Sequence, residues 1–156
     1  MLDTSLFCHN VDFVDFKHRR FSRFEPARTC LIRIGDPGFE FSLPNKVPIF
    51  PSIQQTPLRF DPTTENYWGS VHTFEFLDLE EEHPQSITLE QAQALYNAIK
   101  QARDSKCHIV VHCFAGVCRS GAVVNFATKH MGYLEVDGVY RSTNSRVERL
   151  LEQMHK

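Results

Sequence analysis

Apolar residues in this chain occur in short blocks, and the spacing inside the blocks changes along the sequence. Short apolar runs bounded by turn residues predict buried strands at Cys30–Ile34, Thr73–Leu79 and Lys106–Val111. Apolar residues three and four positions apart predict helices from Leu89 to about Arg103, from Ser120 to about Met131, and from near Asn144 onward. Because strands alternate with helices, we expect an α/β fold with a central, largely parallel sheet flanked by helices.

Residues that favour the ends of elements support these boundaries. Thr88 followed by Gln91 has the pattern of a capping box at the start of the first helix. Gly132 is expected to end the second helix, and Asp36-Pro37-Gly38 is a turn signal that closes the first strand. The buried helix faces should carry Ala92, Leu95, Tyr96 and Ile99 in the first helix and Val147, Leu150, Leu151 and Met154 in the last.

Two stretches have no clear periodicity. In the first, residues 1–25, apolar positions from Val11 to Phe16 fit a strand or a short helix, and a basic cluster (Lys17–Arg20 and Arg23) follows. We interpret the cluster as a solvated surface, and steering of an anionic substrate is the alternative. In the second, residues 43–66, five prolines predict an ordered surface loop with a short strand.

The composition is that of an ordinary globular protein. The chain has 156 residues, which suits a single domain, 1–156, with a hydrophobic core. Apolar residues make up 42% and charged residues 23%. The net charge of -2 gives no general attraction to nucleic acid or to an anionic membrane, so neither is expected as a partner. A monomer is expected.

The ends and the cysteines predict a cytoplasmic protein. Residues 1–10 lack the basic and apolar regions of a signal peptide, and no apolar run approaches the roughly 18 residues that span a bilayer. The five cysteines show no CxxC spacing, which argues against a disulfide framework or a structural zinc site. On a strand, His108 and His112 share one face and Cys107 and Cys113 the other. We therefore expect no metal and no cofactor.

The strongest chemical signal is the run HCFAGVCRSG at residues 112–121. Cys113 follows an apolar strand, Arg119 comes after five further residues, and Ser120 begins a predicted helix. The first N–H groups of a helix lack partners and carry partial positive charge, so a loop that enters a helix can hold an oxyanion. Gly116 gives the loop backbone freedom, and Arg119 offers a planar fork to two phosphate oxygens. The same surroundings favour the thiolate of Cys113, which makes it the candidate nucleophile.

This run resembles the His-Cys-five-residues-Arg-Ser/Thr loop of the cysteine-dependent protein tyrosine and dual-specificity phosphatases. Segments 29–38, 74–79 and 143–151 are similar to those of small bacterial and phage members. The resemblance implies a protein tyrosine phosphatase-like fold. It also implies hydrolysis of phosphomonoesters, above all phosphotyrosine in proteins, through a phosphocysteine intermediate. Whether phosphoserine and phosphothreonine are also substrates stays open.

The resemblance assigns roles inside the run. Cys113 is the nucleophile, Ser120 assists the departure of its sulfur in the second step, and His112 orients the loop through hydrogen bonds. The phosphoryl oxygens are expected to be held by the guanidinium of Arg119 and by the backbone N–H groups of the loop, which belong to Phe114, Ala115, Gly116, Val117, Cys118 and Arg119.

Two residues outside the run complete the expected site. Asp78 is the candidate general acid, although Glu80, Glu81 and Glu82 follow it closely and no Trp-Pro-Asp triplet is present. Asn144 either contacts the site, as the resemblance implies, or only caps the last helix.

Some alternatives remain at this stage. Cys118 and Cys113 bracket the loop as in the low-molecular-weight tyrosine phosphatases, so Cys118 is either a partner for a reversible protective disulfide or a small buried loop residue. A rhodanese-like sulfurtransferase and a phosphate-binding module without turnover are the rival functions. The loop has no basic residue before Arg119, which favours phosphoproteins over phosphoinositides or RNA 5′-phosphates.

Overall fold

The computed structural model describes residues 5–12, 25–37, 68–113, 117–136 and 142–156. These residues form a five-stranded sheet in the order β3-β2-β4-β1-β5, and every neighbouring pair of strands is parallel. The strands are β1 (Phe7–Asp12), β2 (Thr29–Gly35), β3 (Ser70–Glu75), β4 (His108–Cys113) and β5 (Leu134–Val136). The predicted α/β fold with a central parallel sheet is confirmed.

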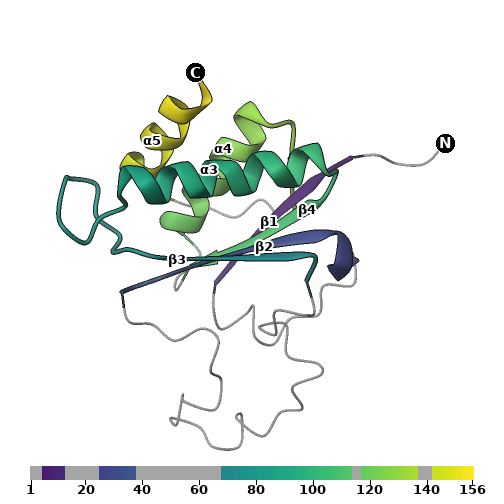
Figure 1. The fold of residues 1–156 in the computed structure, drawn as a ribbon, viewed down its shortest axis with the longest axis horizontal. Helices are drawn as coiled ribbons and strands as arrows, with labels where there is room; N and C mark the ends of the chain where they lie inside the picture. Colours follow the sequence, from purple (N-terminus) through teal and green to yellow (C-terminus); the bar gives the residue numbers. More distant parts are fainter. Residues whose placement is uncertain (1–4, 13–24, 38–67, 114–116, 137–141) are drawn as a thin grey trace, which may run out of the picture.

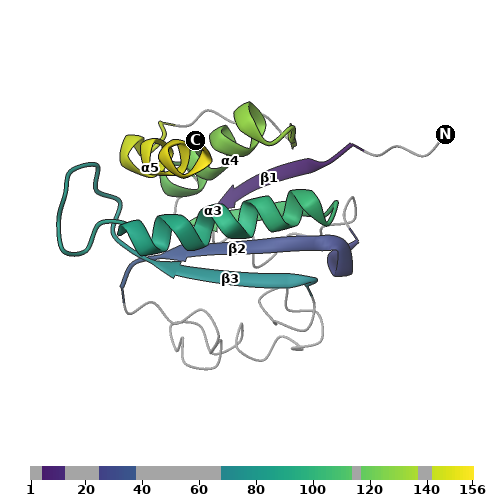
Figure 2. The same ribbon diagram turned by 45° about the horizontal axis from the view of Figure 1, so that its top comes forward.

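The three α-helices in the described part of the chain cover the same face of the sheet (Figures 1 and 2). They are α3 (Leu89–Asp104), α4 (Arg119–His130) and α5 (Ser145–His155). Helices α3 and α4 pack on the strands, and α5 lies against both of them. A 3₁₀ turn, η1 (Pro26–Arg28), leads into β2. None of the helices in these residues has the length and apolar character that crossing a membrane requires.

Successive strand residues point to opposite faces of the sheet and enter two separate apolar clusters. The larger cluster lies beneath the helices and includes Ile109, Val111 and Cys113 of β4. The smaller cluster, on the other face, includes Val110 and Trp68. The alternation therefore fixes the direction of Cys113, whose side chain belongs to the face that the helices cover.

The third strand differs from its predicted bounds, because it was expected at Thr73–Leu79. The amide of Phe76 still donates to the Gly35 carbonyl at 3.0 Å, but the amide of Leu77 donates to Gln85 at 2.7 Å. The chain thus leaves the sheet after Phe76. As a result Asp78 lies in a loop, which we call the 77–87 loop, and not at a strand end.

Strand β4 ends two residues later than predicted, and its last residue, Cys113, is in register with Asp12 of β1. Near the start of the chain, where a strand or a short helix was expected from Val11 to Phe16, Val11 lies in strand β1, and residues 13–16 fall outside the described residues. The basic cluster and the proline-rich stretch at 43–66 fall outside the described residues.

The predicted helix ends are confirmed. Thr88 Oγ1 accepts from the Gln91 amide at 3.0 Å, and Gln91 Oε1 accepts from the Thr88 amide at 2.9 Å, which completes the capping box. Gly132 follows α4 with a φ of +78°, a left-handed conformation that favours glycine. All the residues predicted to be buried in α3 are buried. Of the four predicted to be buried in α5, three are buried and Met154 is partly exposed.

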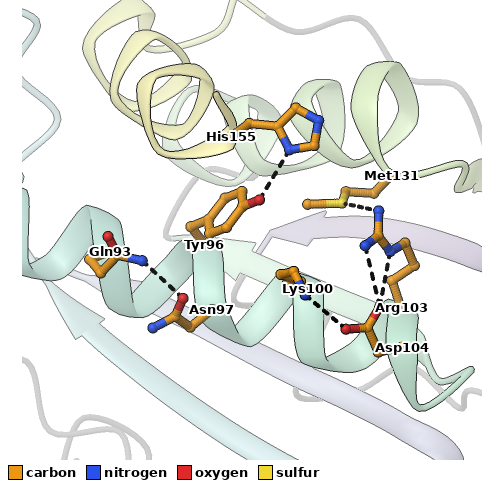
Figure 3. A network of polar contacts seen from close by, with 8 residues as sticks. All are labelled: Gln93, Tyr96, Asn97, Lys100, Arg103, Asp104, Met131 and His155. Carbon is orange, nitrogen blue, oxygen red and sulfur yellow. Dashed lines mark hydrogen bonds and ion pairs between the residues drawn. The ribbon is translucent and has the colours of Figure 1, made fainter.

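Side-chain contacts join the three helices (Figure 3). The Tyr96 hydroxyl of α3 lies 3.1 Å from Nδ1 of His155 at the end of α5. Arg103 of α3 donates to the sulfur of Met131, just after α4, at 3.1 Å. These contacts hold α4 and α5 in place on α3.

Candidate active site

The site lies where the carboxyl ends of β2, β3 and β4 meet, because parallel strands end at the same edge of a sheet. Strand β2 lies between β3 and β4, with Arg33 in register with His112 on one side and Gly35 with Glu75 on the other. The chain that follows β2 and the chain that follows β3 therefore leave the sheet side by side, next to the end of β4. Asp36 follows β2, and Phe76 follows β3.

Cys113 is buried beside the first turn of α4. Its side chain is 2% exposed, and its Sγ lies 3.1 Å from Oγ of Ser120, which is itself fully buried. Ser120 is the second residue of α4, so its hydroxyl lies among the N–H groups that a helix leaves unpaired at its start. The structure thus brings the predicted nucleophile and the predicted hydroxyl together.

Arg119 begins α4 and is 6% exposed. Its Nη1 donates to Oδ1 of Asp36 at 2.8 Å and to the carbonyl of Phe76 at 2.6 Å. Its Nε is buried and has no hydrogen-bond partner among the described residues. One nitrogen of the guanidinium is therefore fixed by the ends of β2 and β3, and the Nε side of the group stays available for an anion.

His112 lies on the sheet face opposite to the helices, away from Cys113. Its Nε2 accepts from Nε of Arg33 at 3.2 Å. Burial, and then the Arg33 charge, lower the pKa of His112 well below its usual range. His112 is accordingly neutral at pH 7, and its hydrogen bond with Arg33 joins β4 to β2 directly before Cys113, the predicted nucleophile.

Asp78 is exposed and is held by the start of α5. Nδ2 of Asn144 donates to Oδ1 of Asp78 at 2.7 Å and to the carbonyl of Leu79 at 3.2 Å. Oδ1 of Asn144 accepts from the Val147 amide at 3.1 Å, so Asn144 is also the N-cap of α5. Its backbone amide donates to Cys118 at 3.0 Å. Asn144 therefore caps α5, and it also contacts Asp78, the predicted general acid.

The carboxylate of Glu80 is engaged differently from that of Asp78. It accepts from the backbone amide of Ser145 at 3.0 Å and from the Ser145 hydroxyl, and these bonds lower the pKa of Glu80. Arg146 adds two further bonds to the carbonyl of Ile87. The first residues of α5 thus hold the 77–87 loop, and Glu80 serves this attachment as a charged acceptor.

Cys118 is the N-cap residue of α4, and its thiol is close to both Asp78 and Cys113. Burial raises the pKa of its thiol to about 11, and the neighbouring carboxylate of Asp78, which accepts a hydrogen bond from the thiol, adds to the rise. The thiol is protonated at neutral pH. Of the two alternatives for Cys118, this favours the buried loop residue over a reversible disulfide with Cys113.

Three predicted oxyanion-binding residues, Phe114, Ala115 and Gly116, lie outside the described residues. The described ones, Val117, Cys118 and Arg119, adjoin the start of α4. Sequence reasoning missed Asp36, which it treated only as part of a turn, and Ser145. Neither has a local signal, because each acts through a partner more than sixty residues away in sequence.

No group of three metal-binding side chains occurs within the part of the chain that the structure describes. Comparison with known proteins adds no assignment: no protein family, no curated protein and no solved structure matches this chain.

Proposed function

We propose that this protein hydrolyses phosphomonoesters, with phosphotyrosine in proteins as the leading substrate class, and uses Cys113 as a covalent nucleophile. The observation that carries the proposal is the arrangement at the start of α4. There, a buried cysteine faces a serine hydroxyl at 3.1 Å, and the adjacent Arg119 has a buried Nε without a partner in the described residues. A dianionic phosphoryl group would provide the missing acceptor.

In the first step the thiolate of Cys113 attacks phosphorus. The S–P bond forms as the ester P–O bond breaks, and the leaving oxygen takes a proton from the carboxyl group of Asp78. The contact of Asp78 with Asn144 and Cys118 supports this assignment because it keeps the carboxyl group close to the end of the 112–121 run. Glu80 is a poorer candidate, since Ser145 stabilises its charged form.

In the second step a water molecule attacks the phosphocysteine. Its proton passes to the carboxylate of Asp78, the S–P bond breaks, and inorganic phosphate leaves. The hydroxyl of Ser120 is within hydrogen-bond distance of the departing sulfur and would stabilise it as a thiolate. In both steps, Arg119 and the N–H groups at the start of α4 would stabilise the negative charge that develops on the phosphoryl oxygens.

Hydrolysis of p-nitrophenyl phosphate and of a phosphopeptide panel by wild type and Cys113→Ser tests the proposal. We expect wild-type activity and a loss of at least about 10³-fold in the variant, because the nucleophile is removed. Cys107→Ser is the matched control: it changes a free, partly buried cysteine just before the other end of β4 and should keep wild-type activity. Phosphatase activity that survives in Cys113→Ser would contradict the mechanism. Sulfur transfer from thiosulfate without phosphatase activity would contradict the function.

A further inference from the structure

We infer that Asp36 is a positioning residue, which selects the edge of the Arg119 guanidinium that meets the phosphoryl group. The inference rests on the proposed function, since it concerns the same site. It starts from an observation that the proposed function does not use: the carboxylate that holds the buried arginine comes from the exposed residue directly after β2.

Both hydrogens on Nη1 of Arg119 are used in hydrogen bonds. Nη1 carries two hydrogens, and it has two acceptors, Oδ1 of Asp36 at 2.8 Å and the Phe76 carbonyl at 2.6 Å. A guanidinium binds an oxyanion best through two parallel N–H groups on one edge. Because both Nη1 hydrogens are engaged, the edge that remains is the one formed by Nε and Nη2. Nε is the atom that lacks a partner among the described residues.

The position of β2 explains how one carboxylate can act in this way. Strand β2 lies between β3 and β4, so Asp36 leaves the sheet beside the chain of Phe76, and its carboxylate reaches Arg119 at the start of α4. Without Asp36, the Phe76 carbonyl would be the one remaining acceptor for Nη1 within the described residues, and the planar group could turn about its side-chain bonds. A rotation would remove the Nε–Nη2 edge from the phosphoryl oxygens.

The different exposure of Asp36 and Arg119 indicates that their ion pair positions the guanidinium more than it stabilises the fold. The Asp36 side chain is 60% exposed, whereas that of Arg119 is 8% exposed. An ion pair with one largely exposed partner contributes little to the free energy of unfolding. Loss of Asp36 should therefore disturb the reaction much more than the fold.

The test compares Asp36→Ala, Asp36→Asn and wild type in kcat, KM and melting temperature. We expect Asp36→Ala to lose about 10- to 100-fold, mainly in kcat, because a misplaced donor weakens transition-state contacts more than ground-state binding. Asp36→Asn retains an acceptor oxygen at the same position and should recover most of this loss. Both should melt close to wild type. Asp104→Ala is the matched control, an exposed carboxylate that pairs with Lys100 and Arg103 on α3.

A second measurement keeps this inference separate from the proposed function. Binding of inorganic phosphate to Cys113→Ser, with and without Asp36→Ala, needs no turnover. We expect roughly 10-fold weaker phosphate binding when Asp36 is replaced. If wild type hydrolyses no phosphomonoester but the binding difference is found, the proposed function fails and the role of Asp36 stands. If wild type is active and Asp36→Ala matches it in kcat and in phosphate binding, the role of Asp36 fails. No phosphate binding to Cys113→Ser would overturn the role of Asp36 as well.

Discussion

One cysteine directly precedes strand β4 and another ends it, and the surroundings of the two differ. Cys107 lies just before the strand, with its Sγ 3.8 Å from the Ser105 carbonyl, and lines a cavity of about 150 Å³ together with small and neutral residues. Cys113 ends the strand and faces Ser120 and the start of α4. Helix α3 ends near Cys107, whereas α4 begins near Cys113.

The difference follows from the direction of the chain in a parallel α/β fold. Helices begin at the carboxyl edge of the sheet, where their free N–H groups and dipoles favour anions, and they end at the amino edge, where carbonyl groups disfavour them. The same residue type at the two edges of the sheet therefore lies in two different electrostatic surroundings. If the carboxyl edge is the reactive one, changes there should affect the reaction far more than matched changes at the amino edge.

The largest effect is expected from Arg119→Lys. Lysine supplies a point charge and cannot serve the Phe76 carbonyl, Asp36 and a phosphoryl group with one planar fork. We expect kcat to fall by about 10³-fold. Arg103→Lys is the control at the amino edge, where the guanidinium donates to Asp104 and to the sulfur of Met131 (Figure 3). Equal losses in the two variants would show that the carboxyl edge of the sheet is no more reactive than the amino edge.

A smaller effect is expected from Asp78→Asn. Without the proton donor, kcat for substrates with poor leaving groups should fall by about 10²-fold or more, and the basic limb of the pH–rate profile should disappear. Glu80→Gln is the control on the same loop; it should keep the profile and lower the melting temperature, because the Ser145 contacts depend on the charge of Glu80. An unchanged basic limb in Asp78→Asn would identify another residue as the acid.

The sequence was sufficient for features that depend on neighbouring residues. The capping box of Thr88 and Gln91 and the turn at Gly132 are local, so their patterns predicted the helix ends correctly. The closeness of Cys113 and Ser120 also follows from a short loop. Strand β1 was ambiguous because buried His9 and Asn10 interrupt its apolar pattern. The partners of Arg119 were not predictable, because the contact with Asp36 joins residues that only the strand order brings together.

The pH dependence of stability tests the buried position of His112. Its pKa is lowered well below 6.5 in the folded protein, so below pH 6.5 the unfolded chain binds a proton that the folded one does not. The His112 contribution is thus fully present above pH 6.5 and is lost as the pH falls toward its folded pKa, by up to about 1.4 kcal/mol per pH unit. Burial also lowers the pKa of His72, so this residue likewise makes the folded protein less stable as the pH falls. Urea unfolding between pH 5 and 7 should show a smaller slope for His112→Gln than for wild type, whereas exposed His83→Gln should keep the wild-type slope. Equal slopes for His112→Gln and wild type would mean that His112 is not buried in the neutral form.

The smallest effect is expected from Cys118→Ala under mild peroxide. With a pKa of about 11, roughly one Cys118 thiol in ten thousand is ionised at pH 7, and only the thiolate attacks an oxidised sulfur efficiently. Oxidised Cys113 should therefore proceed to sulfinic acid at the same rate in Cys118→Ala and in wild type, with equally little recovery after dithiothreitol. Peptide mass spectrometry would measure this directly. A bridged peptide of Cys113 and Cys118, together with greater recovery in wild type, would restore the protective disulfide. It would also mean that the surroundings of Cys118 change during oxidation, because burial, and after it the Asp78 carboxylate, keep this thiol protonated in the present structure.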